Sequence, residues 1–217
     1  MKITVYGIVQ GVGFRPTVYR VAKAMGLRGY VLNNGSNVEI FVDRDADEFL
    51  SKLRNALPAL ARIDRADVEK CEGEYSDFTI VPSREGRRVS LIPTDTALCQ
   101  TCSRDFADRD DKRHLYPFTN CTECGARFTV ITDVPFDRDR TSMSEFTMCE
   151  SCLTEYRTPQ DRRFHAQTIS CPECGPRYEL WDNDGNKVSG DPFKSFAQRI
   201  DQGKVGILKG WGGMHIV

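Results

Sequence analysis

Four Cys-x-x-Cys pairs dominate the sequence and take up eight of its nine cysteines. They form two copies of one pattern, because a shift of 50 residues places Cys99 on Cys149 and superposes the acidic, basic and aromatic positions between the pairs as well. A repeat that preserves its spacers together with its cysteines indicates two copies of one small module. Each copy has too few apolar residues for a core of its own, so a bound metal is expected to stabilise it.

The spacing of the pairs is typical of a four-cysteine zinc site. In each copy 18 residues separate one pair from the next, and two such pairs can close a tetrahedron of thiolates around one ion. We expect two structural zinc ions without an open coordination position, and therefore no chemistry at the metals. Redox-active pairs and iron–sulfur clusters are the alternatives. The expected ligands are Cys99, Cys102, Cys121, Cys124, Cys149, Cys152, Cys171 and Cys174.

The spacing does not decide which pairs share an ion. Pairing within each repeat is the simplest arrangement, although tandem modules can interleave, first pair with fourth and second with third. With four cysteines available per site, His114, His165 and His215 are expected to be surface or hydrogen-bonded residues and not ligands. Cys71 falls on an expected strand and should be an inert, packed residue.

Charge and composition exclude several classes of protein. The chain has 30 basic and 31 acidic residues, a balance that argues against a protein that coats nucleic acid. No stretch approaches the roughly 20 apolar residues of a membrane span, and the N-terminus lacks the apolar core of a signal peptide. We therefore expect a cytoplasmic protein with reduced cysteines. The basic residues of the repeats are expected to form a solvated charged face: Arg109, Lys112, Arg113, Arg162 and Arg163.

The first 88 residues alternate strand and helix signals. One expected helix ends at Gly26, and a second runs from a capping box at Asp45 and Glu48 to about Pro58. The order β-α-β-β-α-β is that of a ferredoxin-like sandwich, in which two helices cover one face of an antiparallel sheet. The fold class is therefore α+β, with this sandwich followed by the zinc-stabilised double repeat and a truncated α/β segment. Strands are expected at residues 2–9, 28–33, 37–43, 62–71 and 77–82.

A glycine-rich turn joins the first strand to the first helix. Its sequence, Gly11-Val12-Gly13-Phe14-Arg15-Pro16, places free backbone N–H groups at a helix N-terminus, where an anion is favoured. Arg15 adds a planar pair of donors that matches phosphate oxygens. The turn lacks the Lys-Ser/Thr of a Walker loop. Taken alone it fits an anion site and a simple turn equally well.

The turn and the following hairpin together resemble the acylphosphatase family. The similarity covers about the first 90 residues and includes GIVQGVGFR at 7–15 and GYVLN at 29–33. It implies that Arg15 and the amides of Gly11, Val12, Gly13 and Phe14 hold a phosphoryl group. It also implies that Asn33 orients the attacking water. Positioning and charge stabilisation suffice for an acyl phosphate, which already carries a good leaving group.

A longer resemblance covers all 217 residues. The chain is similar to the N-terminal part of the HypF family of carbamoyltransferases that mature [NiFe] hydrogenase. The similarity runs through YPFTNCTECG at 116–125, PFDR at 135–138, DRRFHAQ at 161–167 and ILKGWGGMH at 207–215, with small departures at Ala126, Trp211 and Met214. It implies three parts: an acylphosphatase-like domain at 1–88, a tandem four-cysteine domain at 89–180, and the start of a YrdC-like domain at 181–217.

The HypF resemblance implies a role in a longer reaction sequence. Family members use ATP to make carbamoyl-adenylate and pass the carbamoyl group to the C-terminal cysteine of HypE. This chain stops at Val217, so we expect only the first step, hydrolysis of carbamoyl phosphate, and no ATP binding by this segment alone. Residues 186–217 hold apolar side chains without a complete layer to bury them against, so we expect them to be poorly ordered or prone to associate. The alternative is a catalytically silent zinc-containing scaffold that binds a protein or nucleic acid.

Because the turn and the cysteines fall in separate domains, the sequence predicts that they act independently. Loss of the Cys121 thiolate should release one zinc ion and disorder its module. Hydrolysis at Arg15 should continue. Loss of hydrolysis would mean that the two domains are coupled.

Overall fold

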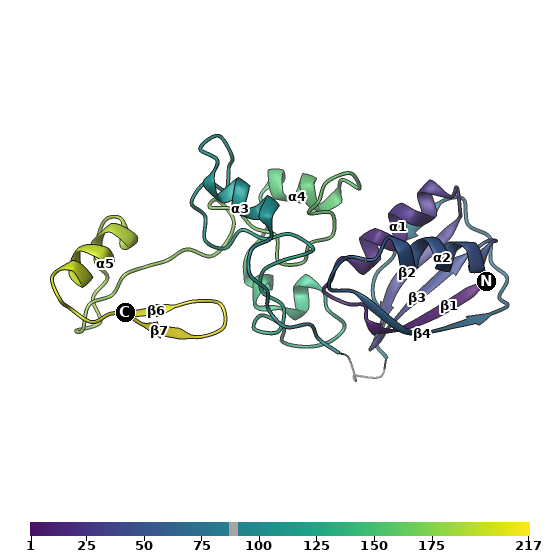
Figure 1. Cartoon of the computed structure of the whole chain (residues 1–217), viewed down its shortest axis with the longest axis horizontal. Helices are drawn as coiled ribbons and strands as arrows, with labels where there is room; N and C mark the ends of the chain where they lie inside the picture. The colour runs from purple at the N-terminus through teal and green to yellow at the C-terminus, as the bar shows by residue number, and fades with distance from the viewer. Residues whose placement is uncertain (87–90) are drawn as a thin grey trace.

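A computed structural model describes residues 1–86 and 91–217. The N-terminal sheet with its two helices, the cysteine repeats and a C-terminal helix with a hairpin follow one another along the long axis of the molecule (Figure 1). The domain boundary expected between residues 88 and 89 lies outside the described residues.

The N-terminal part is a five-stranded sheet with strand order β4-β1-β3-β2-β5. Every pair of neighbours is antiparallel except β2 and β5, which are parallel, so the sheet is mixed and not wholly antiparallel as expected. The four-strand order β4-β1-β3-β2 confirms the α+β, ferredoxin-like prediction, as do the two helices that connect β1 to β2 and β3 to β4. The elements are β1 (Lys2–Ile8), α1 (Phe14–Ala24), β2 (Gly29–Asn34), β3 (Asn37–Val42), α2 (Ala46–Asn55), β4 (Arg62–Glu69) and β5 (Phe78–Ile80).

Both helices pack on one face of this sheet (Figure 1). Alternate strand residues point to that face, so Ile3 of β1 and Val31 of β2 are fully buried there against Phe14 of α1 and Phe49 of α2. The same alternation carries Asn33 to the helix-covered face, two residues beyond Val31. Asn33 therefore lies at the end of β2 that faces the start of α1.

Two local expectations are wrong. Asp45 does not cap α2 through its side chain; its backbone is left-handed, with φ of 52°, and the side chain accepts no hydrogen bond from the first turn. Cys71 is exposed and lies beyond the end of β4, with its thiol donating to the carbonyl oxygen of Glu72 at 3.5 Å. The strand prediction ran two residues past the end of β4. Asp45 does stand at the N-cap of α2, where its carbonyl accepts from the Phe49 N–H, but its side chain takes no part.

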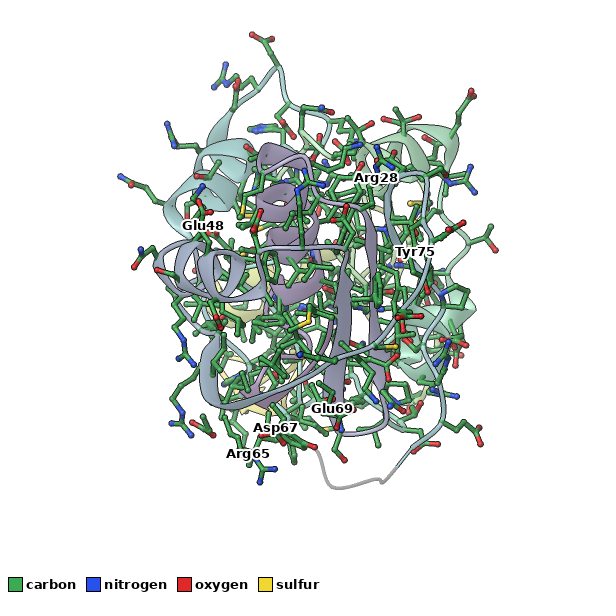
Figure 2. The ribbon with its side chains drawn as sticks, turned by 90° about the vertical axis from the view of Figure 1, so that its right-hand side faces the viewer. Arg28, Glu48, Arg65, Asp67, Glu69 and Tyr75 are labelled. Atoms are coloured by element: carbon green, nitrogen blue, oxygen red, sulfur yellow. The ribbon has the colours of Figure 1, made fainter. Side chains whose placement is uncertain are left out.

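The outer strand β4 is protected by charge. Arg65, Asp67 and Glu69 lie at the margin of the molecule (Figure 2), and Arg65 pairs with Asp67 along the strand. Charged side chains on an edge strand oppose pairing with another sheet. The charges on β4 therefore disfavour pairing of this edge with another sheet.

The two cysteine repeats have the same backbone plan. Each carries a short helix after its first cysteine, α3 (Gln100–Ala107) in the first and α4 (Glu150–Arg157) in the second. The equivalent residues Leu115 and His165 share the rare left-handed conformation, with φ of 53° and 55°. Two short 3₁₀ turns, η1 (Arg138–Arg140) and η2 (Ser142–Glu145), lie between the repeats.

Buried arginines join the repeats reciprocally. Arg113 of the first repeat donates to the Glu155 carboxylate and the Ser170 carbonyl of the second. Its counterpart Arg163 donates to Asp105 and to the Asn120 carbonyl of the first. Arg113 is 1% and Arg163 is 4% exposed, so the expected solvated charged face is wrong for these two residues. They form the interface between the modules.

Arg113→Ala should destabilise the repeats strongly. Although burial raises the pKa of Glu155, hydrogen bonds from Arg113 hold it below its ordinary value, so the carboxylate is charged and depends on its partner. Removing one member of a buried pair costs about 3–5 kcal/mol. Chemical unfolding of the metal-loaded chain would measure the loss. Arg109→Ala, at an exposed arginine of the same repeat, is the control and should stay within about 0.5 kcal/mol; equal effects of the two substitutions would contradict the interface role.

The C-terminal part contains α5 (Pro192–Asp201) and the hairpin β6 (Ile207–Lys209) and β7 (Met214–Ile216). Asp191 caps α5 by accepting from the backbone N–H groups of Phe193 and Lys194. No residue of this helix is buried, and Val205 and Ile207 are 78% and 66% exposed. This part therefore forms a regular helix and hairpin and leaves apolar side chains exposed. None of the described helices combines the length and the apolar character needed to cross a bilayer.

Candidate active site and four-cysteine clusters

The glycine-rich turn is shaped by left-handed glycines. Gly11 and Gly13 have φ of 69° and 74°, a conformation that side-chain-bearing residues rarely adopt. Gly13 is also the N-cap of α1 and offers no side chain to the first helical amides. Those amides are the groups that an anion at a helix N-terminus would meet. We call residues 11–15 the phosphate loop.

Arg15 lies in the first turn of α1 and is 8% exposed. Its guanidinium donates to the Phe136 carbonyl oxygen at 3.0 Å and to Ser83 Oγ at 3.3 Å, and pairs with Asp137 Oδ1 at 2.7 Å. Phe136 and Asp137 come from the segment between the two cysteine repeats. The arginine is therefore enclosed by a part of the chain more than 100 residues away.

Asn33 is fully buried and meets the same carbonyl. Its Nδ2 lies 3.4 Å from the Phe136 oxygen, so Arg15 and Asn33 converge on one acceptor. Among the described residues, no donor reaches Asn33 Oδ1, although that atom is buried. An orphaned buried acceptor is costly unless a water or ligand satisfies it. The structure thus brings together Arg15 and Asn33, the two residues that the sequence singled out. The buried Asn33 Oδ1 is an acceptor that no described residue pairs with.

Arg127 links the phosphate loop to the first cysteine repeat. Its guanidinium, 2% exposed, donates to the Gly11 carbonyl and to the carbonyls of Cys121, Cys124 and Ala126. In a planar, trans peptide unit the N–H points away from the carbonyl. The hydrogen bond from Arg127 to the Gly11 carbonyl therefore also fixes the direction of the Val12 N–H. The loop and the first repeat are therefore in direct contact, although the sequence places them in separate domains.

Two cavities meet at Arg15. A small one of about 20 Å³, room for about one water, lies between the loop glycines, Thr122, Arg127 and Phe136. An open cleft of about 510 Å³ lies on the other side, where it is lined by Ser83 and Asp137. Arg15, His165 and Gln167 line both. Arg15 consequently stands between the loop and the solvent-filled cleft.

His165 is neutral at this position. Burial lowers its pKa to about 4, and the nearby positive charge of Arg15 acts in the same direction. Its ring packs on Phe164 and Tyr156. At pH 7 Arg15 therefore supplies the positive charge of this junction, and His165 adds none.

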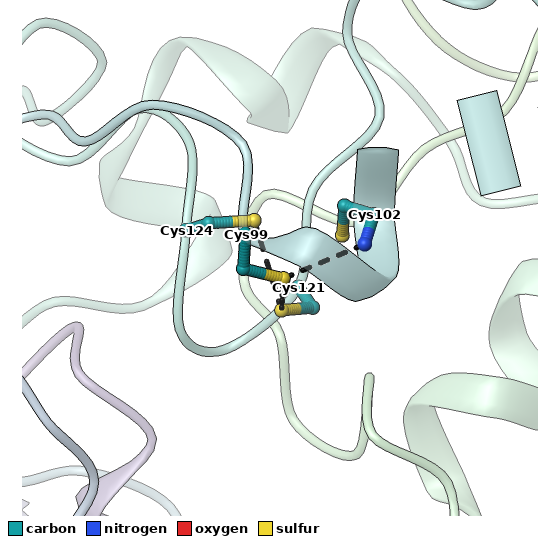
Figure 3. A group of neighbouring side chains, drawn as sticks. All are labelled: Cys99, Cys102, Cys121 and Cys124. Carbon is teal, nitrogen blue, oxygen red and sulfur yellow. Dashed lines mark hydrogen bonds between the residues drawn. The ribbon is translucent and has the colours of Figure 1, made fainter. Parts of the chain in front are cut away.

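The eight repeat cysteines lie in two groups. Cys99, Cys102, Cys121 and Cys124 form one (Figure 3), and Cys149, Cys152, Cys171 and Cys174 form the other; within each, all four sulfurs are within 4.8 Å of one another. The sulfurs are thus gathered within each repeat and do not interleave. All are free thiols in the described structure.

The sulfur geometry fits a tetrahedral zinc site. Zn–S bonds of about 2.3 Å require tetrahedron edges of about 3.8 Å. The Sγ–Sγ separations are 3.8 Å for Cys99 and Cys121, 3.7 Å for Cys121 and Cys124, and 3.7 Å for Cys149 and Cys171. With all four sulfurs within 4.8 Å of one another, each group could hold one ion through protein ligands alone.

Each cluster also receives an arginine from the other repeat. Arg162 donates to Cys102 Sγ at 3.0 Å, and Arg113 donates to Cys152 Sγ at 3.4 Å. The pKa of Cys102 is strongly lowered by hydrogen bonds from Cys121 and Cys124, with a further contribution from Arg162. Donors around a thiolate cluster orient the ligands and offset their charge. Arg113 and Arg162 therefore link the repeats and also stabilise the clusters.

The sequence did not identify Gln10, Arg127, Phe136 and Asp137 as site residues. Gln10 accepts the Phe136 N–H at 2.9 Å and donates to the Gly35 carbonyl at 2.8 Å, which fixes Phe136 beside the loop. The PFDR motif at 135–138 is part of the HypF resemblance, but the sequence assigns no role to its residues. Pairing it with a turn 120 residues away needs the three-dimensional structure.

Two family models match the chain. The acylphosphatase model matches residues 1–80, and the model of the HypF finger matches residues 98–131 and 148–181. The first match contains the phosphate loop and Asn33. The second contains all eight clustered cysteines.

Curated relatives agree with both matches. The carbamoyltransferase HypF of Synechocystis sp. is 47% identical over 223 residues, which cover 100% of this chain and 29% of that protein. The acylphosphatase of Thermotoga petrophila is 43% identical over 86 residues, which cover 37% of this chain and 93% of that protein. The chain thus spans under a third of the HypF relative and nearly all of the acylphosphatase.

Solved structures are similar over the whole chain. The crystal structure of full-length HypF in the phosphate- and nucleotide-bound form matches with a TM-score of 0.91 at 41% identity, covering 99% of this chain and 29% of that one. The T. kodakarensis HypF structure matches with a TM-score of 0.87 at 44% identity, covering 99% and 28%.

Proposed function

The chain belongs to the HypF carbamoyltransferase family, and we propose that it carries the acyl-phosphate hydrolysis step of that family, with carbamoyl phosphate as the substrate. The observation that carries this proposal is the convergence of Arg15 and Asn33 beside the phosphate loop. The acylphosphatase match over the same residues supports an enzymatic role.

In the proposed reaction the phosphoryl group binds the amides of Gly11, Val12, Gly13 and Phe14, with Arg15 on its oxygens. Water held by the orphaned Asn33 Oδ1 attacks phosphorus, and the bond from phosphorus to the acyl oxygen breaks. Carbamate leaves with the bonding electrons, and the water protons pass to phosphate and solvent. Fixed donors around the transferring group stabilise its charge without a covalent intermediate.

The two clusters are proposed to hold one structural zinc ion each, through Cys99, Cys102, Cys121 and Cys124 and through Cys149, Cys152, Cys171 and Cys174. Zinc would supply folding stability to the repeats and no catalysis. Free cysteines throughout the described chain suit a reducing compartment, and we propose the cytoplasm.

The wider role rests on the family alone. We propose the domain division 1–88, 89–180 and 181–217, and place this step before an ATP-dependent formation of carbamoyl-adenylate and transfer to HypE in the whole protein. Because the chain spans under a third of its HypF relatives, neither later step is assigned to it. A silent zinc scaffold is the competing function, and the buried orphan acceptor at Asn33 favours the enzyme.

Phosphate release from carbamoyl phosphate tests the proposal, with Asn33→Ala as the variant. Removing a group that positions the nucleophile should lower kcat by about 10²-fold. Asn34→Ala is the matched control, because Asn34 is the next residue of β2 and points to the opposite face; its rate should stay within about threefold. No release by the parent chain above the spontaneous rate would favour the scaffold.

A further inference from the structure

Residues 136 and 137 form a strap across the phosphate loop. The Phe136 N–H donates to Gln10 Oε1, and its carbonyl oxygen accepts from both Arg15 and Asn33. Asp137 pairs with Arg15 at 2.7 Å and is one fifth exposed. The strap is therefore held by the two proposed catalytic residues and by a residue that immediately precedes the loop.

The strap presents two acceptors to the site, the Phe136 carbonyl and the Asp137 carboxylate. A carbonyl oxygen and a carboxylate repel the oxygens of a phosphoryl group, so neither can help to bind that end of the substrate. Both can accept a hydrogen bond from an amino group. The chemistry of the strap therefore suits a part of the substrate that carries N–H donors.

The position of the strap matches the acyl end. Phe136 lines the small cavity beside the loop, Asp137 lines the open cleft, and Arg15 lies between the two. A phosphoryl group bound by the loop and Arg15 would direct its acyl group toward the cleft. The amino nitrogen of carbamoyl phosphate is three bonds from phosphorus, so groups in contact with Arg15 are within its reach.

The strap lies outside the part of this chain that matches a single-domain acylphosphatase. The 43% identical relative from Thermotoga petrophila is matched over 93% of its length by the first part of this chain, so residues 136 and 137 have no counterpart there. The cysteine-repeat part thus adds two acceptors to a loop that otherwise recognises phosphate alone. An amino group is what distinguishes carbamoyl phosphate from acetyl phosphate, which offers a methyl group in its place.

We propose that the Asp137 carboxylate and the Phe136 carbonyl bind the amino group of carbamoyl phosphate and so select it over other acyl phosphates. When the phosphoryl group takes Arg15, the two acceptors released by the arginine turn to the substrate N–H groups. Acetyl phosphate would leave them unpaired, and sites built to bind an N–H discriminate strongly against analogues that lack it. The inference rests on the proposed hydrolysis at Arg15.

The test is the ratio of kcat/KM for carbamoyl phosphate to kcat/KM for acetyl phosphate. Any effect of a variant on Arg15 itself acts on both substrates and cancels in the ratio. Asp137→Ala should lower the ratio by about 10- to 100-fold, the range for losing one hydrogen bond to a charged group. Asp137→Asn should lower it less, because the amide oxygen still accepts.

Asp110→Asn is the matched control, since it removes the same charge from an exposed side chain that does not line the cleft; its ratio should equal that of the parent. If Asp137→Ala changed kcat/KM for both substrates by the same factor, the ratio would be unchanged. The strap would then only cover Arg15, and the inference would be overturned. Failure of the parent chain to hydrolyse either substrate would instead overturn the proposed function.

Discussion

Arg15→Ala is expected to lower kcat/KM for carbamoyl phosphate by about 10³-fold or more, the effect of removing an arginine from a transferring phosphoryl group. The guanidinium lies between the loop cavity and the open cleft, and it is the positive charge at their junction. Arg15→Lys should recover only a small part of the rate, because an ammonium cannot bind two phosphate oxygens in one plane. Phosphate release under initial-rate conditions measures both variants.

The Arg15→Ala experiment also needs a control for lost stability. Arg15 holds Phe136, Asp137 and Ser83, so its loss weakens the contact between the two parts of the chain as well as anion binding. Arg20 provides the comparison: it lies on the same helix and donates to the carbonyls of Pro159 and Asp161 in the second repeat. Arg20→Ala breaks similar contacts away from the loop and should keep its rate within about threefold. Equal losses in the two alanine variants would assign Arg15 a structural role only.

The sequence predicted the strands and helices of the N-terminal part because they follow from short-range patterns, whereas Asn33 was singled out by the acylphosphatase resemblance. Period-two alternation fixed which face each strand presents, and Asn33 follows Val31 to the helix-covered face. The tight turn at Gly35, where φ is 56°, fixed the register of β2 and β3. The clustered cysteines were predicted from spacing alone, whereas their pairing within each repeat required the structure.

Contacts between distant segments produce no short-range pattern in the sequence. Arg113 and Arg163 are indistinguishable in sequence from solvated arginines, and their burial depends on an acid in the other repeat. The parallel pairing of β5 with β2 and the enclosure of Arg15 by Asp137 depend in the same way on how distant segments pack. Side-chain periodicity reports which face is buried, and it does not report what covers that face.

Arg127 couples the first cluster to the phosphate loop, so Cys102→Ser should release one metal ion per chain and also impair hydrolysis. Cys102 is fully buried in its cluster, and a serine hydroxyl does not replace a thiolate ligand. Loss of the metal frees the backbone around Cys121 and Cys124, whose carbonyls hold the Arg127 guanidinium against Gly11. Small misplacements of groups around a reacting centre cost up to about 10²-fold, and we expect a loss of about 10- to 100-fold in kcat/KM.

Two further variants separate coupling from general unfolding. Cys152→Ser breaks the second cluster at an equally buried position, yet no residue of that cluster holds Arg127, so it should release one metal ion with a smaller loss of rate. Arg127→Ala should reproduce the kinetic defect while both metal ions remain bound, as metal analysis would show. Arg127→Lys should not restore the rate, because one ammonium cannot span the carbonyls of Gly11, Cys121 and Cys124. Full activity of a Cys102→Ser chain that has lost its metal would show instead that the phosphate loop keeps its shape without the repeat, and that the contact through Arg127 only joins the two parts.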